Sequence, residues 1–329
     1  MMINVGERLG AHWSFVFVLL LIAAATLISC TPSETPSDVS DVAPVVLDLP
    51  TRFPGAERVV AIGDLHGDLE ATRRALRLAG AIDDQDRWIG GNLVVVQTGD
   101  ILDRGGDELE ILTLLENLAT EARTAGGAVH ALNGNHELMN VKLDLRYVTL
   151  EGFLDFLPTP LTESDTVVPE MVVDGVEGRI KAFRPGGPVA LRLAQRNVVA
   201  IVGDTVFVHG GVVPHVAEYG IERLNQESRA WMRKELTCIP EVLLAEDGPL
   251  WSRHYSRDVD DADCRLLEET LEMLDAERMV VGHTVQDAGM TSACEGKVWR
   301  IDVGLAAHYG GAPAVLELSG GRVQVLAPE

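Results

Sequence analysis

Three short apolar segments of the chain each end in a glycine followed by a carboxylate or an amide, at nearly constant intervals. Residues 58–62, 93–97 and 128–132 are mostly Val, Ala, Leu and Ile, and they precede Asp64, Asp100 and Asn135, which are 36 and 35 residues apart. Short runs of this kind predict buried strands, and the intervals suit strand–helix–strand units with right-handed crossovers in a parallel sheet. The polar residues should therefore meet beyond the carboxyl ends of the strands, where open α/β sheets bind ligands.

Amphipathic helices are expected between these strands. Asp68 is placed to cap a helix that ends near Gly80. A second helix, rich in Leu and Glu, is expected from about Asp107 to Ala122, with Glu110 completing a capping box.

The second half of the chain changes to antiparallel patterns. Residues 198–202 and 205–208, joined by Gly203-Asp204, predict a tight hairpin, and one helix is expected over about 216–236. A further strand is expected at 279–281, and the chain should finish as an antiparallel meander of three strands at 298–303, 314–318 and 322–326.

Together these elements predict an α/β fold of two mixed β-sheets packed face to face with helices outside. No linker divides residues 54–329, so they are expected to form one domain. The chain carries 50 acidic and 27 basic side chains, a formal net charge of -23. A field of that sign repels phosphate polymers, which excludes general nucleic-acid binding.

The first thirty residues have the pattern of an export signal. Residues 11–28 are almost wholly apolar, and the run ends in Leu-Ile-Ser before Cys30. This ending resembles the lipobox of bacterial lipoproteins, in which the signal is cut before a cysteine that carries lipid. Cys30 would then be the lipidated first residue of the mature chain. The alternative is an uncleaved anchor, although the run barely reaches the roughly 18 apolar residues of a spanning helix.

Residues 31–53 are rich in Thr, Ser, Pro and Asp and would form a solvated tether between the lipid and the domain. The domain is thus expected outside the cytoplasm, attached to a bacterial membrane in the periplasm or at the cell surface. Such a compartment permits one disulfide, and the sequence favours Cys238 with Cys264, which flank an Asp-rich loop. Ordinary buried thiols at Cys238, Cys264 and Cys294 are an equal alternative.

Six polar residues that follow short strands are of metal-ligand type. All lie beside a glycine and offer carboxylate, imidazole or amide donors that suit divalent ions: Asp64, His66, Asp100, Asn135, His209 and His283. Gathered at one sheet edge they could hold two ions, with Asp100 as the shared ligand. Two such ions favour attack of a hydroxide on phosphorus. His130, in contrast, lies inside an apolar strand and is expected to be a core residue.

Five segments in this order resemble the signature of the calcineurin-like metallophosphoesterases. They are G-D-L-H-G at 63–67, G-D-I-L-D-R-G at 99–105, G-N-H-E at 134–137, H-G-G at 209–211 and G-H at 282–283. The D-R-G and N-H-E forms are similar to the phosphoprotein phosphatase branch. Eukaryotic Ser/Thr phosphatases usually carry Arg where this chain has Asn133, and Asp-Pro where it has Arg253. The chain is therefore more similar to the Shewanella-like phosphatases.

The resemblance implies roles for individual residues. His136 would donate a proton to the leaving oxygen, with Asp103 orienting and charging its ring. Arg104 and Arg253, together with Asn135, would bind the phosphoryl group. Two divalent ions, Mn, Fe or Zn, would supply a bridging hydroxide for in-line attack without a phosphoenzyme. One ion would be bound by Asp64, His66 and Asp100, and the other by Asp100, Asn135, His209 and His283.

The implied activity is that of a metal-dependent phosphomonoesterase, acting as a Ser/Thr or Tyr protein phosphatase. Hydrolysis of nucleotides or dinucleoside polyphosphates is the enzymatic alternative, because relatives with that activity share the motifs. A non-catalytic lipoprotein that uses the metal cluster as a structural pin is a third hypothesis. It is disfavoured because structural sites usually close their coordination with Cys and His.

Overall fold

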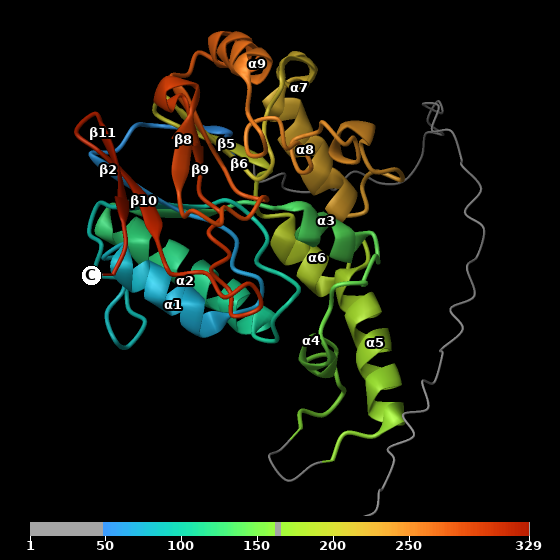
Figure 1. Cartoon of the computed structure of the whole chain (residues 1–329). Helices are drawn as coiled ribbons and strands as arrows, with labels where there is room; N and C mark the ends of the chain where they lie inside the picture. The colour runs from blue at the N-terminus through green and yellow to red at the C-terminus, as the bar shows by residue number, and fades with distance from the viewer. Residues whose placement is uncertain (1–48, 162–165, 329) are drawn as a thin grey trace, which may run out of the picture. The chain divides into compact units, whose positions relative to one another are not determined.

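The computed structural model describes residues 49–161 and 166–328 (Figure 1). The predicted signal, Cys30 and most of the tether lie outside these residues. Within the described ranges, no helix is long and apolar enough to cross a membrane.

One of two mixed sheets has the strand order β11-β10-β2-β3-β4. Its strands β2 (Arg58–Ile62), β3 (Val94–Gln97) and β4 (Ala128–Ala131) are parallel, as predicted. Their crossovers contain α1 (Leu69–Leu78) and α2 (Glu108–Ala125). Antiparallel to β2 lies β10 (Val315–Ser319), which forms a hairpin with β11 (Arg322–Leu326).

The other sheet has the order β1-β5-β6-β7-β9-β8. The predicted hairpin is formed by β5 (Val199–Val202) and β6 (Thr205–Val208), and β7 (Arg278–Val281) lies parallel to β6. The edges are β1 (Arg52–Phe53), paired with β5, and β8 (Thr291–Ala293), paired with β9 (Val298–Arg300).

Two expectations about this sheet were wrong. The meander does not form, because β9 pairs in parallel with β7, whereas β10 and β11 belong to the opposite sheet. The apolar pattern identifies each strand, but the residues between β9 and β10 are numerous enough to reach either sheet. Arg52 and Phe53, expected in the tether, are part of the sheet.

Alternation along the strands explains why the two sheets face each other. Val59 and Ala61 of β2 join Phe207 of β6 and Val280 of β7 in one apolar cluster. The intervening residues, such as Val60 of β2, join a second cluster together with helix residues. Because successive side chains point to opposite faces, the first cluster lies between the sheets and the second beneath the helices. The predicted fold class is thus confirmed.

Helix ends follow the expected capping in part. Asp68 accepts the N–H of Ala71 at the start of α1, as predicted. Asp107 makes no capping hydrogen bond to α2, so the expected capping box is wrong. Its carboxylate instead accepts the N–H of Leu69 and joins the starts of the two helices.

The single helix expected near 216–236 is two helices. They are α7 (Pro214–Tyr219) and α8 (Ile221–Met232), divided at Gly220, whose φ of 93° breaks the helical backbone. The remaining helices are α3 (Asn135–Val141), α4 (Leu150–Leu154), α5 (Pro169–Phe183), α6 (Pro188–Leu193), η1 (Glu241–Leu243), α9 (Asp261–Met273) and η2 (Cys294–Gly296). In Figure 1, α4 and α5 lie side by side, away from the two sheets.

The predicted disulfide partner of Cys264 was also wrong. Cys264 of α9 is bonded to Cys294 of η2, and not to Cys238. The bond fastens α9 to the β8–β9 connection, a proximity that comes from tertiary packing and has no counterpart in the local sequence.

Candidate functional site

The six predicted ligands all follow strands that end at the same edge of the two sheets. Asp64 and His66 come after β2, Asp100 after β3 and His209 after β6. His283 follows β7, and Asn135 is the first residue of α3 after β4. The structure brings all six side chains together, as the spacing of the motifs predicted.

Asp100 lies at the centre of this cluster and is shared by two groups of candidate ligands. One group is His66, Asp100 and His136, and the other is Asp100, His209 and His283, with ligand atoms within 4.8 Å of one another in each group. Asp100 Oδ2 lies 3.8 Å from His66 Nε2 and 3.2 Å from His209 Nε2. A shared carboxylate between two ligand groups is the arrangement that a pair of cations requires.

The atoms that face one another around His209 are better suited to binding a cation than to hydrogen bonding with one another. His209 Nδ1 lies 3.1 Å from the carbonyl oxygen of Thr98, so its Nε2 is left as an acceptor. That Nε2 faces Asn135 Oδ1 at 2.7 Å and Asp100 Oδ2 at 3.2 Å. Facing acceptors repel unless a cation lies between them, so this donor set suits a divalent ion.

Two histidines of the cluster, His66 and His283, are held in the neutral form that metal ligation needs. Burial lowers the pKa of His66 to about 4, and burial together with the neighbouring His209 and Arg253 lowers that of His283 to about 2. His66 Nδ1 contacts the carbonyl oxygen of Leu102 at 3.0 Å, which leaves Nε2 facing the cluster. A neutral imidazole offers a lone pair to a cation near pH 7.

Carboxylates are crowded on the other side of the cluster. Burial, followed by the charges of Asp302 and Asp100, raises the pKa of Asp64 well above its usual value. Burial likewise raises the pKa of Asp302 to about 6. Bound cations would compensate this concentration of negative charge.

Several of these residues have a backbone conformation that side chains seldom adopt. His66, Asp100, Asp103 and His283 have φ values of 44°, 57°, 67° and 67°. Each left-handed residue costs free energy and persists only because contacts with the surrounding structure hold it in place. Such residues are typical of functional sites, and here they direct side chains into the cluster.

Two glycines make the close approach possible. A Cβ atom at Gly134 would collide with the side chain and backbone of Asp100, and one at Gly282 would collide with the carboxylate of Asp64. The glycine beside each ligand motif therefore has a steric reason, which the sequence pattern alone did not give.

Glu137 fixes the loop that carries Asp100. Its carboxylate accepts the backbone N–H groups of Asp100 at 2.9 Å, Ile101 at 2.8 Å and Gly134 at 2.6 Å. Glu137, the acidic residue of the G-N-H-E motif, thus holds the backbone of the ligand-bearing loop in place.

His136 and Asp103 form the pair that the resemblance implied. His136 Nδ1 lies 2.6 Å from Asp103 Oδ2, and its Nε2 points toward Asp100, 3.8 Å from Oδ2. Burial alone would lower the pKa of His136, but the charges of Asp100 and Asp103 and the bond to Asp103 raise it to about 9. These carboxylates favour the protonated form of His136, whose free nitrogen faces the cluster, so His136 fits the role of a proton donor and not that of a ligand. His66 is then left with Asp100 and with Asp64, whose Oδ2 lies 3.9 Å from His66 Nε2.

The two arginines that the sequence singled out lie in different surroundings. Arg253 Nη1 donates to Thr284 Oγ1 at 2.6 Å and to the carbonyl oxygen of His283 at 3.3 Å, which places its guanidinium beside the second ligand group. Arg104 stacks on Tyr147, 4.0 Å from the ring centroid, and Tyr147 in turn lies 5.1 Å from the His136 ring.

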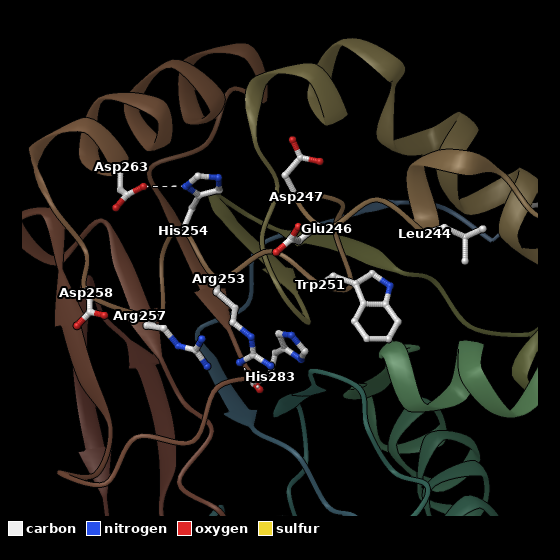
Figure 2. Close-up of a pocket in the computed structure, with 10 residues that line it drawn as sticks. All are labelled: Leu244, Glu246, Asp247, Trp251, Arg253, His254, Arg257, Asp258, Asp263 and His283. Carbon is white, nitrogen blue, oxygen red and sulfur yellow. Dashed lines mark hydrogen bonds and ion pairs between the residues drawn. The ribbon is translucent and has the colours of Figure 1, made fainter. Parts of the chain in front are cut away.

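A cavity of about 1000 Å³ opens beside this centre. Figure 2 shows Arg253 and Arg257 extending toward His283, with Trp251 across from Arg257 and the acidic side chains of Glu246 and Asp247 on a third side. The complete lining is Leu244, Glu246, Asp247, Trp251, Arg253, His254, Arg257, Asp258, Asp263 and His283. The cavity thus joins the candidate metal centre to a surface of mixed charge.

Sequence analysis missed four buried polar residues around the centre. Asp302, beside Asp64, had only a weak signal, because it lies two residues after the end of β9 but has no neighbouring glycine, unlike the six predicted ligands. Glu108, Asn140 and Arg179 were given no role in the site, because each lies in a helix and the local sequence does not show what its side chain contacts.

Comparison with known proteins identifies a family and several relatives of this chain. Residues 57–287 match the family model of the calcineurin-like phosphoesterases. The chain is 44% identical over 301 residues to Shewanella-like protein phosphatase 2 of Arabidopsis thaliana, covering 82% of this chain and 77% of that protein. It is 30% identical over 266 residues to Shewanella-like protein phosphatase 1 of Plasmodium berghei, covering 77% of this chain and 69% of that protein.

A solved structure is also similar. The cold-active protein-tyrosine phosphatase of a psychrophilic Shewanella species superposes with a TM-score of 0.66 at 27% identity, covering 84% of this chain and 80% of that one. The chain therefore belongs to the calcineurin-like metallophosphoesterases and, within them, to the Shewanella-like protein phosphatases.

Proposed function

We propose that this chain is a metal-dependent protein phosphatase that hydrolyses phosphomonoesters of Ser, Thr or Tyr side chains outside the cytoplasm. The observation that carries the proposal is the position of the His136–Asp103 pair beside Asp100, the residue shared by both candidate ligand groups. A proton donor next to a paired cation site is what hydrolysis of a phosphomonoester requires.

Two divalent cations bound to this cluster would neutralise phosphoryl oxygens and make a water molecule acidic enough to attack phosphorus. Their ligands in the proposal are Asp64, His66 and Asp100 for one site and Asp100, Asn135, His209 and His283 for the other. Mixed oxygen and nitrogen donors accept Mn, Fe or Zn, so the metal identity is settled by metal analysis and not by the ligand types.

His136 protonates the leaving oxygen as its bond to phosphorus breaks. Asp103 fixes the ring orientation and keeps the imidazolium charged, because Asp100 would share its charge with the cations whereas Asp103 would not. Arg253 and Arg104 bind phosphoryl oxygens, and a guanidinium suits that role because of its forked donors. Asn135 adds an amide at the same place.

The cavity favours a peptide over a dinucleoside polyphosphate. Four acidic side chains line it, namely Glu246, Asp247, Asp258 and Asp263. They would repel further phosphate groups, whereas a peptide can offer basic side chains to them and an acidic side chain to Arg257. The Shewanella neighbour is named as a tyrosine phosphatase, which makes phosphotyrosine peptides the first substrates to test.

Two observations support the proposed location. The apolar run before Cys30 supports export and lipidation, and the Cys264–Cys294 disulfide supports an oxidising compartment. Mass spectrometry of the protein from bacterial membranes should find Cys30 as the lipidated N-terminal residue. A Cys30→Ser variant that still carries lipid and stays in the membrane fraction would reject the lipoprotein part alone.

The activity is tested on three substrates: a phosphotyrosine peptide, a phosphothreonine peptide and a dinucleoside polyphosphate. The protein is stripped of metal and then given Mn, Fe or Zn. We expect metal-restored hydrolysis of a peptide, and a fall of about 10²-fold or more in His136→Ala at unchanged metal content. Turnover of the polyphosphate alone would replace this proposal with the small-molecule alternative, and no turnover at all would support a binding role.

A further inference from the structure

Arg179, in the penultimate turn of α5, is a fully buried charge with partners on three other helices. Its Nη1 donates to Glu108 Oε2 of α2 at 2.5 Å and to the carbonyl oxygen of Gly152 in α4 at 2.7 Å. Its Nε and Nη2 donate to Asn140 Oδ1 of α3 at 3.1 and 2.8 Å. A buried guanidinium is costly unless its donors are satisfied, and these contacts satisfy it.

Asn140 carries the effect of Arg179 toward the active site. Because its Oδ1 accepts two bonds from Arg179, the amide cannot turn over, and Nδ2 must face the other way. Nδ2 donates to Asp103 Oδ1 at 3.0 Å and to the carbonyl oxygen of His136 at 3.0 Å. Arg179 thus ensures that the NH₂ end of the Asn140 amide, and not its oxygen, faces Asp103.

Glu108 carries a second connection to the same residue. It pairs with Arg179 through both carboxylate oxygens, and its Oε1 also accepts the backbone N–H of Asp103 at 2.5 Å. Asp103 has a left-handed φ of 67° and needs such support from outside. Arg179 therefore reaches Asp103 twice, through its side chain and through its backbone.

We infer that Arg179 is a positioning residue for proton donation, acting through Asn140 and Glu108 on Asp103 and so on the His136 ring. The inference rests on the proposed function, because it assumes that His136 protonates the leaving oxygen. Arg179 does not touch the substrate site itself: its nearest approach to the pair is 3.7 Å, from Nη2 to Asp103 Oδ1.

A positioning role differs from a purely structural one in its dependence on the leaving group. Protonation matters most when the leaving oxygen is basic, as for phenyl phosphate or a phosphoserine peptide, and little when it is weakly basic, as for 4-nitrophenyl phosphate. Loss of stability or of metal would instead lower the rates for all of these substrates by the same factor.

The experiment compares kcat for these substrates in the full chain loaded with metal. Arg179→Lys keeps the charge but cannot bind Glu108 and Asn140 together. Because unpaired Glu108 could prevent folding, Arg179→Met combined with Glu108→Gln is the second variant. We expect kcat for phenyl phosphate to fall about 10- to 100-fold and that for 4-nitrophenyl phosphate less than about 3-fold, with KM nearly unchanged.

One control variant and one further measurement accompany these variants. Leu118→Ala removes a buried side chain further along α2 and should affect all the substrates equally, if at all. A proton NMR spectrum of the metal-free protein gives a readout that needs no activity. The strongly hydrogen-bonded Nδ1–H of His136 should give a downfield signal in the parent chain, which is broadened or lost in Arg179→Lys.

The outcomes distinguish a failure of this inference from a failure of the proposed function. If His136→Ala shows the leaving-group dependence and both Arg179 variants lower all the rates uniformly, Arg179 is only structural and the inference is overturned. If His136→Ala itself shows no such dependence, the assignment of the proton donor fails first, and the inference fails with it.

Discussion

The two sides of the candidate centre are built in opposite ways. On the closed side, His136 and Asp103 are 6% and 0% exposed, and Asp103 is held by Asn140 and Glu108. On the open side, Arg253 is only partly buried, and Arg257 is exposed in a cavity of about 1000 Å³.

The difference indicates that the two sides have different roles in the reaction. A proton donor held in place before the substrate arrives needs no reorganisation during the reaction, so the closed side suits the chemical step. The open side has a mixed set of charges that different peptides can meet, so it suits the choice of substrate. Variants on the closed side should change the dependence on the leaving group, whereas variants on the open side should change the dependence on the peptide.

The largest effect is expected where the two sides meet, at Asp100. Asp100→Asn removes the charge shared by both ligand groups, so both cations should be lost or weakened. We expect turnover of all substrates to fall by about 10³-fold or more, since the cations contribute several kcal/mol of charge stabilisation. Metal analysis after dialysis checks the cause, and a variant with full metal content and full activity would remove Asp100 from its bridging role.

Among variants of the open side, Arg253→Ala should give the largest effect. Loss of a guanidinium that binds the phosphoryl group should lower kcat/KM by about 10- to 100-fold. The loss should be similar for phenyl and 4-nitrophenyl phosphate, because proton donation is untouched. Steady-state kinetics of both substrates tests this, and a larger loss for phenyl phosphate would show that the two sides are not independent.

The sequence predicted the centre better than its support, for a physical reason. Asp64, Asp100 and His283 are found from local patterns, because a strand end and a neighbouring glycine determine where each side chain goes. The same local rule predicted β2, β3 and β4 correctly. Asp302 also follows a strand, but it has no neighbouring glycine, so this rule does not single it out.

The support could not be predicted because it depends on contacts distant in the sequence. Arg179 of α5 meets Glu108, 71 residues away at the start of α2, and no local pattern links these two positions. The pairing of β9 with β7 and the Cys264–Cys294 bond are also choices among distant partners. Local patterns identify which segments form strands and helices, but tertiary packing decides which of them meet.

A smaller effect is expected from Arg257→Gln, at the rim of the open side. Arg257 is exposed and lies near Arg253, whose pKa is lowered by burial and then by the charge of Arg257. We expect kcat/KM for phosphopeptides with an acidic neighbour to fall about 3- to 10-fold, and that for 4-nitrophenyl phosphate to stay unchanged. Matched peptides with Glu or Gln beside the phosphorylated residue are the measurement. An equal fall for both peptides would mean that Arg257 does not read the neighbouring residue.

The smallest effect on turnover is expected at His130, a half-buried histidine outside the centre. Its ring lies on Phe53, with the centroids 4.0 Å apart, and burial lowers its pKa to about 4, whereas carboxylates raise that of His136 to about 9. Below the unfolded-state pKa of about 6.5, the unfolded chain binds a proton that folded His130 rejects until about pH 4. Its contribution to stability is therefore complete above pH 6.5 and is lost as the pH falls toward 4.

His130→Gln should remove about 2 kcal/mol of the decrease in unfolding free energy between pH 7 and pH 4.5, with turnover at pH 7 unchanged. Urea unfolding of the parent chain and the variant at both pH values measures this. Parallel pH profiles would show that His130 is protonated as easily in the folded chain as in the unfolded one, and that burial without a carboxylate partner does not set its charge.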